Sequence, residues 1–265
     1  MDFFTKYSKI VRLNKSYVCI GLDSDSHKIP SFIKKEDDYI FRFNQRIIDQ
    51  TYSFCAAYKP NFAFYISQGI KGIESLKKTI EYIPKDIPVI IDIKAGDIGN
   101  TMEQYSHSIF DYFGADAITI NILMGSDVIE ACLKTKNSFA FALVLTSNKS
   151  ANDFFKYHDL YKELSIKVKE NSELKLGAVI GATQSADLYH IRKLMPNNIL
   201  LVPGIGTQGG DLELVCRYLK YSNEDARFLV NSSRGIIFSD STENFSKVAK
   251  EETIKLKNNI NEYLN

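Results

Sequence analysis

The stretch IIDIKAGDIGNT, from Ile90 to Thr101, begins as an apolar strand pattern and then becomes rich in charge. Asp92, Lys94 and Asp97 place three ionisable groups within six residues. Ionisable side chains are costly to bury unless they are paired. Their position at the end of an apolar run therefore indicates a site at the end of a strand. The rest of the chain repeats this strand pattern.

Eight short apolar runs have the composition of buried strands. They are Tyr17–Gly21, Cys55–Lys59, Val89–Lys94, Ala117–Asn121, Phe139–Thr146, Gly177–Gly181, Ile199–Pro203 and Phe228–Asn231. Stretches with a helical pattern separate or follow them: Asp37–Thr51, Ser67–Tyr82, Thr101–Phe113, Ser126–Thr135, Leu160–Glu170, Ser185–Lys193, Asp211–Leu219 and Asn244–Leu264.

This alternation predicts the α/β class, with parallel strands joined by right-handed crossovers. Near-continuous apolar strands are expected where both faces of a sheet are buried. Eight strand–helix units in 265 residues predict a (β/α)8 TIM barrel, with an open doubly wound sheet as the alternative. No Pro/Gly/Ser-rich linker interrupts the pattern, so residues 1–265 are expected to form a single barrel domain.

Composition argues against several functional classes. Lys and Arg number 33 and Asp and Glu 32, so the formal net charge of +1 provides no basic field for nucleic acid. No apolar stretch is long enough to cross a membrane, and the first residues lack a signal-peptide pattern, so a cytoplasmic protein is expected. Cys19, Cys55, Cys132 and Cys216 lack C-x-x-C or zinc-ligand spacing, which predicts reduced core residues.

Polar side chains gather where the predicted strands end, and in a TIM barrel these ends build the active site. Asp23 follows the first strand and Lys59 ends the second. Asp92 and Lys94 lie two apart on a strand, so their side chains share a face that Lys59 can approach. Such groups keep one another ionised in a partly dry place. A structural ion pair at the rim is the alternative, and the presence of Lys59 and Asp97 favours a site.

The ends of the seventh and eighth strands carry a second pattern. The loop Pro203–Asp211 reads PGIGTQGGD, and the eighth strand runs into Arg234 and Gly235. Loops at these two positions of a TIM barrel frequently bind phosphate through backbone N–H groups. The glycines make the first loop flexible enough to act as a lid. Together with Gln208 and the forked guanidinium of Arg234, they predict a small phosphorylated ligand.

Three motifs together resemble one family, the orotidine 5′-monophosphate decarboxylases. They are Tyr58-Lys59-Pro60-Asn61, Asp92-x-Lys94-x-x-Asp97-Ile-Gly-x-Thr101 and Pro203-Gly-Ile-Gly-x-Gln208-x-Gly-Asp211. The resemblance extends from the first strand to the eighth, with the motifs in the family's order. It implies a barrel that converts orotidine 5′-monophosphate to uridine 5′-monophosphate in the last step of pyrimidine nucleotide synthesis. It also implies that the reaction needs neither a metal nor an organic cofactor.

The resemblance implies roles for individual residues. Lys59, Asp92, Lys94 and Asp97 are similar to the family's catalytic tetrad of alternating charges. Lys94 would stabilise and protonate the carbanion at C6 of the substrate ring, and Asp92 would destabilise the departing carboxylate. The family forms a homodimer in which the counterparts of Asp97 and Thr101 reach the partner's site. An orotate phosphoribosyltransferase, fused to the chain or associated with it, is a further partner that this resemblance leaves open.

Substrate binding is implied at nine positions. Asp23 and Thr101, together with the catalytic Lys59, resemble the ribose-hydroxyl contacts, and Asn61 lies near them in the sequence. Ser147 resembles the residue that hydrogen-bonds the pyrimidine, with Thr146 as the alternative. Gln208, Arg234 and Gly235 resemble the 5′-phosphate clamp, and Pro203 is a further substrate-binding position.

Two alternative functions remain open at this stage. The first is a metal-dependent sugar-phosphate enzyme of the same superfamily, such as a hexulose-phosphate synthase, which also uses an Asp-x-Lys-x-x-Asp strand, or a pentose-phosphate epimerase. Lys59-Pro60-Asn61 and the Gln208 loop favour the decarboxylase. The second is a catalytically silent nucleotide-binding or scaffold protein, which the intact tetrad disfavours.

Overall fold

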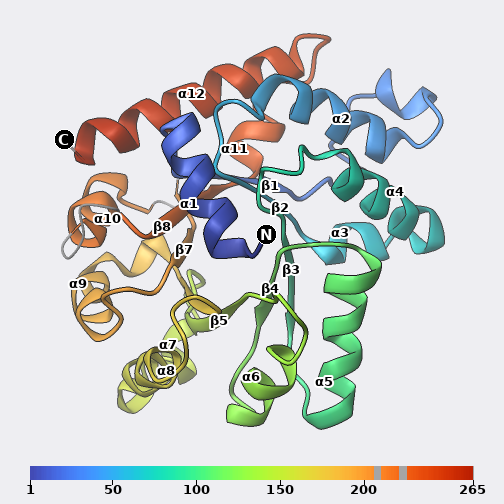
Figure 1. Cartoon of the computed structure of the whole chain (residues 1–265). Coiled ribbons are helices and arrows are strands. Elements are labelled where there is room, and N and C mark those ends of the chain that lie inside the picture. The colour runs from blue at the N-terminus through green and yellow to red at the C-terminus, as the bar shows by residue number, and fades with distance from the viewer. Residues whose placement is uncertain (206–209, 221–225, 265) are drawn as a thin grey trace.

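The computed structural model describes residues 1–205, 210–220 and 226–264. Eight strands stand in the centre of the molecule and helices surround them (Figure 1). The strands are β1 (Val18–Leu22), β2 (Ala57–Pro60), β3 (Ile90–Ala95), β4 (Ala117–Ile120), β5 (Ala140–Leu145), β6 (Leu176–Ile180), β7 (Leu200–Pro203) and β8 (Phe228–Ser232). Each predicted strand overlaps one of them.

The strands form a closed parallel barrel. Hydrogen-bonded neighbours follow the order β2-β1-β8-β7-β6-β5-β4-β3, and every pair along this order is parallel. Two parallel bridges, Tyr58 with Val89 and Asn61 with Asp92, join β2 to β3 and close the ring. The TIM barrel prediction is confirmed, and the open doubly wound alternative is wrong, because such a sheet would leave two edges unpaired.

The helices of the repeating units also follow the sequence pattern. They are α2 (Tyr39–Thr51), α4 (Gly69–Tyr82), α5 (Gly99–Ser106), α6 (Ser126–Cys132), α8 (Leu160–Lys169), α9 (Ser185–Leu194), α10 (Leu212–Leu219) and α12 (Phe245–Leu264). The stretch predicted as helical over Thr101–Phe113 is helical in two parts. Helix α5 begins at Gly99 and continues as a π-helical segment, His107–Tyr112.

Several short elements lie outside the repeating pattern. They are α1 (Phe3–Asn14), α3 (Phe62–Ile66), α7 (Ala151–Phe154), α11 (Arg234–Ile237) and the 3-10 turns Ile33–Lys35, Tyr157–Asp159 and Ala182–Gln184. Only α1 is longer than a few residues, and its start carries an N-cap that satisfies a free backbone donor. The Asp2 carboxylate accepts a hydrogen bond from the backbone N–H of Thr5 at 2.9 Å.

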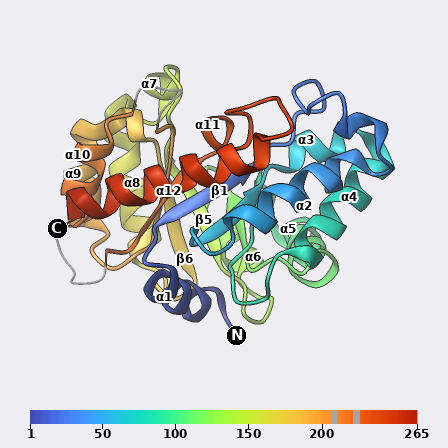
Figure 2. The ribbon, with the colours of Figure 1, turned by 90° about the horizontal axis from the view of Figure 1, so that it is seen from above.

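Helix α1 covers the amino-terminal end of the barrel. Phe3 stacks on Phe139 beside the start of β5, with ring centroids 4.4 Å apart. The Tyr7 hydroxyl donates to the carbonyl oxygens of Ala226 and Phe228 at the start of β8. Figure 2 shows α1 at the end of the barrel opposite α7 and α11. With this end covered, the carboxyl end is the one open to a ligand.

The barrel strands are apolar on both faces, as helix-covered parallel strands are. Every residue of β1, β2, β4, β5 and β6 is buried. The four cysteines are buried and free, which confirms the expectation of reduced core thiols. None of the helices in the described ranges combines the length and apolar character needed to cross a lipid bilayer.

Candidate active site

A cavity of about 380 Å³ opens at the carboxyl end of the barrel. This volume lies within the usual range of small-ligand sites. Its polar lining consists of Asp23, Lys59, Asp92, Lys94, Thr119, Thr146, Ser147, Asn148, Asn231, Ser232, Ser233 and Arg234, and its other lining residues are Leu143, Val179, Leu201, Pro203, Gly204 and Ile205. Polar residues at the strand ends therefore gather around one cavity, as the sequence predicted, and apolar side chains complete its lining.

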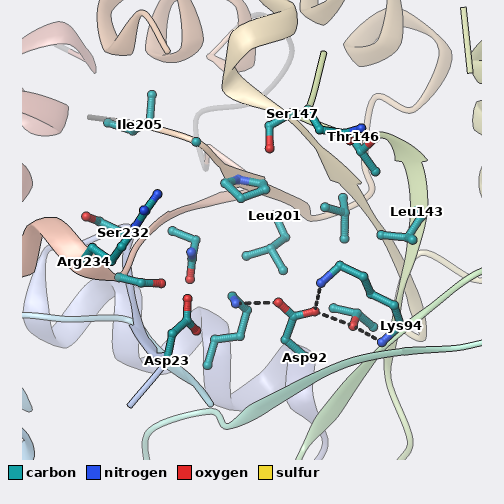
Figure 3. A pocket seen from close by; sticks show the side chains of 18 residues that line it. Asp23, Asp92, Lys94, Leu143, Thr146, Ser147, Leu201, Ile205, Ser232 and Arg234 are labelled. Atoms are coloured by element: carbon teal, nitrogen blue, oxygen red, sulfur yellow. Dashed lines mark hydrogen bonds and ion pairs between the residues drawn. The ribbon is translucent and has the colours of Figure 1, made fainter. Parts of the chain in front are cut away.

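At one side of the cavity the Asp92 carboxylate lies between two ammonium groups. Lys59 Nζ is 2.8 Å from Asp92 Oδ2, and Lys94 Nζ is 2.6 Å from Asp92 Oδ1 (Figure 3). The side chains of Lys59 and Asp92 are 5% and 10% exposed, whereas that of Lys94 is 47% exposed. Lys59 is thus the buried partner of the carboxylate, and of the two lysines Lys94 is the one that a ligand can reach.

The pKa values of this pair follow from burial and charge. Burial by itself would raise the pKa of Asp92, but the Lys59 and Lys94 ammoniums hold it well below its usual range. Burial would lower the pKa of Lys59, but Asp92 and then Asp23 raise it above its ordinary value. Asp92 is therefore a carboxylate and Lys59 an ammonium throughout the neutral pH range.

Strand β3 is irregular at the site residues. The register of β3 against β4 shifts between Ile91 and Ala95. Lys94 has a φ of +53°, in the left-handed region. A residue other than Gly held in this region costs about 1–3 kcal/mol, which the surrounding structure must offset. The expectation that Asp92 and Lys94 lie together is confirmed. The reason given for it, regular alternation along a strand, is wrong at Lys94, because a bulge directs this side chain.

The end of β5 presents hydroxyl groups to the cavity. Thr146 and Ser147 are half-buried there, and both line the cavity. The loop after β6 fixes their backbone, because Thr183 Oγ1 donates to the Ser147 carbonyl at 2.8 Å. Gly181 begins this loop, and a Cβ built on it would lie 2.5 Å from the Ser147 backbone nitrogen. A glycine is therefore required for the two strand ends to approach this closely.

The ends of β7 and β8 form the other side of the cavity. Pro203 and Arg234 line it, and Gly235 follows Arg234 in α11 without lining it. In the view of Figure 3, Arg234 lies on the opposite side of the cavity from Lys94. Gln208 lies outside the described residues, as does most of the glycine-rich part of its loop.

Besides Gly235, three described residues of the predicted site do not line the cavity of their own chain. Asp97 is half-buried and accepts a hydrogen bond from the Ile98 backbone N–H at 2.8 Å. Thr101 is exposed on α5. Asn61 caps α3, and its side chain accepts from the Ala63 N–H at 3.2 Å. A role for Asp97 and Thr101 in a partner's site stays a prediction.

Five polar residues of the cavity lining were not among the predicted site residues: Thr119, Asn148, Asn231, Ser232 and Ser233. Asn231 is buried on β8, and its Oδ1 and Asp23 Oδ1 have no hydrogen-bond partner among the described residues. Buried polar atoms in proteins are nearly always hydrogen-bonded, so these two are available to a ligand in the cavity. Thr119, on β4, also lines the cavity. A polar residue at a predicted strand end was the available signal for Asn231, whereas Thr119 lies inside a predicted strand.

Within residues 1–205, 210–220 and 226–264, no three His, Cys, Asp or Glu side chains are grouped so that they could hold a metal ion.

Comparison with known proteins places the chain in a family. Residues 16–247 match the orotidine 5′-phosphate decarboxylase / HUMPS family. The chain is 44% identical over 256 residues to the orotidine 5′-phosphate decarboxylase of Phocaeicola vulgatus, with 93% of each chain covered. It is 41% identical over 264 residues to that of Bacteroides fragilis, covering 96% of this chain and 95% of the relative.

A solved structure agrees with these sequence matches. The OMP decarboxylase of Leishmania donovani superimposes with a TM-score of 0.82 at 30% identity, covering 100% of this chain and 99% of that chain. Fold, cavity and sequence thus lead to one assignment: the chain belongs to the orotidine 5′-phosphate decarboxylase / HUMPS family.

Proposed function

We propose that this chain catalyses the decarboxylation of orotidine 5′-monophosphate to uridine 5′-monophosphate, the final step of de novo pyrimidine nucleotide synthesis. The observation that carries the proposal is the Asp92 carboxylate held between Lys59 and Lys94 at the cavity wall. The names of the relatives support the same reaction. No observation favours the metal-dependent sugar-phosphate enzymes over it.

Lys94 is proposed to act on C6 of the pyrimidine ring. When the bond between C6 and the carboxyl carbon breaks, CO2 leaves and the electron pair remains on C6. An ammonium facing this carbon stabilises the charge as it develops and then donates the proton that completes the product. Lys94 is suited to both steps, because its ammonium is exposed to the cavity and Asp92 holds it in place at 2.6 Å.

Asp92 is proposed to act on the substrate carboxylate through repulsion. Two like charges ~4 Å apart at an effective dielectric of ~20 repel by about 4 kcal/mol. At ~1.4 kcal/mol per decade this is at most about three decades in rate. Enzymes commonly accelerate reactions by six decades or more. Stabilisation of the carbanion by Lys94 must therefore contribute more than repulsion by Asp92.

The remaining cavity residues are proposed to hold the nucleotide. Arg234 and Gly235, together with Pro203 and Gln208, would bind the 5′-phosphate, and Thr146 and Ser147 would bind the pyrimidine. The ribose hydroxyls would meet Asp23, whose Oδ1 lacks a partner among the described residues. The phosphate is remote from C6, yet binding energy from it can still be used to lower the barrier of the chemical step.

The decisive experiment is an ultraviolet assay with purified protein, orotidine 5′-monophosphate and an excess of chelator. Loss of the ring carboxyl group changes the absorbance, and uridine 5′-monophosphate is identified by chromatography. We expect turnover to be unaffected by the chelator. Failure to consume the nucleotide, or activity that chelation abolishes and a divalent metal restores, would overturn the proposal in favour of the metal-dependent alternative.

We further infer a homodimer in which Asp97 and Thr101 complete the partner's site. Neither residue lines the cavity of its own chain. Asp97 is followed by Ile98, which is 51% exposed, and the neighbouring strand end carries Met124, which is 60% exposed. Exposed apolar side chains at adjacent strand ends are typical of a protein–protein interface. The proposed enzyme would work in the cytoplasm, where free thiols stay reduced.

Mixed dimers test the shared site. Asp97→Ala and Lys94→Ala chains should each be nearly inactive alone. If Asp97 acts across the interface, a heterodimer of the two contains one site with both groups intact. Mixing after partial unfolding should then restore roughly a quarter of the wild-type activity, since half of random dimers are mixed and each has one intact site. No recovery, with dimers verified by ultracentrifugation, would place Asp97 outside a shared site.

A further inference from the structure

Thr119, in the middle of β4, is 1% exposed and its hydroxyl makes three hydrogen bonds to β3. Thr119 Oγ1 accepts from the backbone N–H of Ile93 at 3.1 Å and from that of Lys94 at 2.9 Å. It donates to Asp92 Oδ1 at 2.9 Å. The same carboxylate oxygen accepts from Lys94 Nζ.

These contacts fix the direction of the hydroxyl. A threonine hydroxyl has one hydrogen to donate and two lone pairs to accept with. Both lone pairs of Thr119 are used by backbone N–H groups, which can only donate. Its single hydrogen must therefore point at Asp92 Oδ1, an oxygen of a carboxylate that can only accept.

The two backbone bonds also account for the bulge in β3. Ile91 is paired with Ile118 and Ala95 with Ile120, so three residues of β3 lie opposite Thr119 alone. In a regular parallel ladder, evenly spaced hydrogen bonds join backbone N–H groups to the carbonyl oxygens of a neighbouring strand. Here the Thr119 side chain accepts both of them. This arrangement leaves Lys94 at φ +53° with its side chain directed into the cavity.

We propose that Thr119 is a positioning residue for the reaction: its hydroxyl holds the β3 bulge that directs Lys94 and orients the Asp92 carboxylate beside it. This inference rests on the proposed decarboxylase function. Thr119 acts through Asp92 and Lys94. Removal of the hydroxyl should therefore lower kcat and leave nucleotide binding largely intact, because the phosphate and pyrimidine ends of the cavity are built by other strands.

Three variants at this position separate the hydroxyl from the volume of the side chain. Thr119→Val keeps the β-branched shape and removes all three hydrogen bonds. Thr119→Ala removes them while leaving room for a water that can accept from the freed backbone N–H groups, so it is the variant to measure if the valine protein does not fold. Thr119→Ser keeps a hydroxyl that can make the same bonds with a less restricted rotamer.

Thr253 supplies a matched control. It is a fully buried threonine on α12, and its hydroxyl donates to the Ala249 carbonyl at 2.7 Å, away from the cavity lining. Thr253→Val therefore removes a buried hydroxyl bond without touching the site.

Measurements are kcat, KM, the Kd for uridine 5′-monophosphate and the melting temperature of each protein. We expect Thr119→Val and Thr119→Ala to lower kcat by about 10- to 100-fold, or about 1.4–2.8 kcal/mol at ~1.4 kcal/mol per decade. The product Kd should stay within about threefold of wild type, a range of under half a decade. Thr119→Ser should recover most of kcat, and Thr253→Val should lower only the melting temperature.

Three results would overturn the inference. One is a wild-type kcat in the folded valine or alanine variant. Another is a serine variant as slow as alanine. The third is a loss confined to the melting temperature, as for Thr253→Val, which would make Thr119 a structural residue only. Absence of decarboxylation by the wild-type protein would instead reject the proposed function, so the two failures are distinguishable.

Discussion

At the scale of single residues, the site depends on charge compensation. The buried Asp92 carboxylate is tolerated because Lys59 and Lys94 each approach one of its oxygens within 2.8 Å. Breaking a buried pair by removing one partner leaves an uncompensated charge and is strongly unfavourable. Of the three, Lys94 is the side chain open to the cavity. The residue-scale predictions therefore concern the two cations that a ligand can reach, Lys94 and Arg234.

Lys94→Ala should lower kcat by at least about a thousandfold, because it removes both the stabilising charge and the proton donor. Binding of uridine 5′-monophosphate, measured by calorimetry, should weaken by less than about tenfold, since the phosphate contacts remain. Lys78→Ala is the control, because Lys78 pairs with Asp38 at 2.7 Å on the surface. Near-normal turnover by Lys94→Ala would refute the role assigned to this lysine.

Arg234→Ala should raise KM by about 10- to 100-fold, because hydrogen bonds to a charged group contribute about 1.5–3 kcal/mol. The measurement is steady-state kinetics over a wide range of nucleotide concentration. The matched control is Arg217→Ala on α10, an exposed arginine that does not line the cavity. A KM equal to that of wild type would exclude Arg234 from the phosphate site.

At the scale of elements, the site depends on how closely strand ends approach one another. Gly21, on β1, and Gly181, after β6, each lie against a serine of a neighbouring strand end. A Cβ on Gly21 would lie 1.8 Å from Ser233 Oγ, and one on Gly181 would lie 2.5 Å from the backbone of Ser147. Contacts under 3 Å force a displacement. These glycines therefore set the spacing of the strand ends that line the cavity.

Gly181→Ala should displace Ser147 and Thr146, raise KM several-fold and destabilise the protein by about 1–3 kcal/mol, the usual cost of overpacking. Gly177→Ala, on the strand that Gly181 follows, is a matched control. Its Cβ would lie 2.4 Å from the Ile199 carbonyl oxygen, near the other end of β6. Kinetics and thermal unfolding should show lower stability in both variants but a raised KM only in Gly181→Ala. Equal KM values would disprove a special role for this contact.

At the scale of the whole molecule, the closed ring of strands joins all parts of the chain. Helix α1 is held to the barrel by Phe3 and Tyr7, and α12 packs its Phe245 against Phe43 of α2, with centroids 5.2 Å apart. The two ends of the chain are therefore tied to the same barrel. We infer that residues 1–265 form a single folding unit.

A single folding unit should unfold in one cooperative transition. We expect far-ultraviolet circular dichroism and intrinsic tyrosine fluorescence to give coincident denaturation curves. The calorimetric enthalpy should equal the van't Hoff enthalpy. Two separable transitions would show that part of the chain folds independently of the barrel.

Stability should also decline in alkali because of the buried thiols. Burial raises the pKa of Cys55 to about 12 and that of Cys132 to about 11. A free thiol has a pKa of about 8.5, so from there upward the unfolded chain loses protons that the folded chain keeps. The stabilisation is thus fully present below about pH 8.5 and is lost as pH rises toward the folded values.

Cys55→Ala should therefore reduce the loss of unfolding free energy between about pH 8.5 and 10 by up to ~2 kcal/mol relative to wild type. Urea denaturation at each pH provides the measurement, and lysine and tyrosine ionisation is common to both proteins. Ser165→Ala, which removes a buried hydroxyl that does not titrate, should lower stability equally at each pH. A Cys55→Ala curve parallel to that of wild type would contradict the prediction.

The sequence alone determined the barrel, because the apolar content of a strand and its alternation with helices are written locally and need no knowledge of partners. It also determined which strand ends carry charge, and Lys59, Asp92 and Lys94 do meet as expected. Short motifs sufficed for the family, because each keeps its chemical groups within a few consecutive residues.

Only the tertiary structure decided how the charged side chains at the strand ends are oriented. The β3 bulge and the positive φ of Lys94 depend on the Thr119 hydroxyl of the adjacent strand. Asp23 and Asn231 each have an oxygen without a hydrogen-bond partner in the described part of the chain. These oxygens and the spacing enforced by Gly181 likewise arise between strands distant in the sequence. Local pattern fixes which groups a strand carries, but orientation is set by hydrogen bonds and packing with neighbouring strands, which a local pattern does not contain.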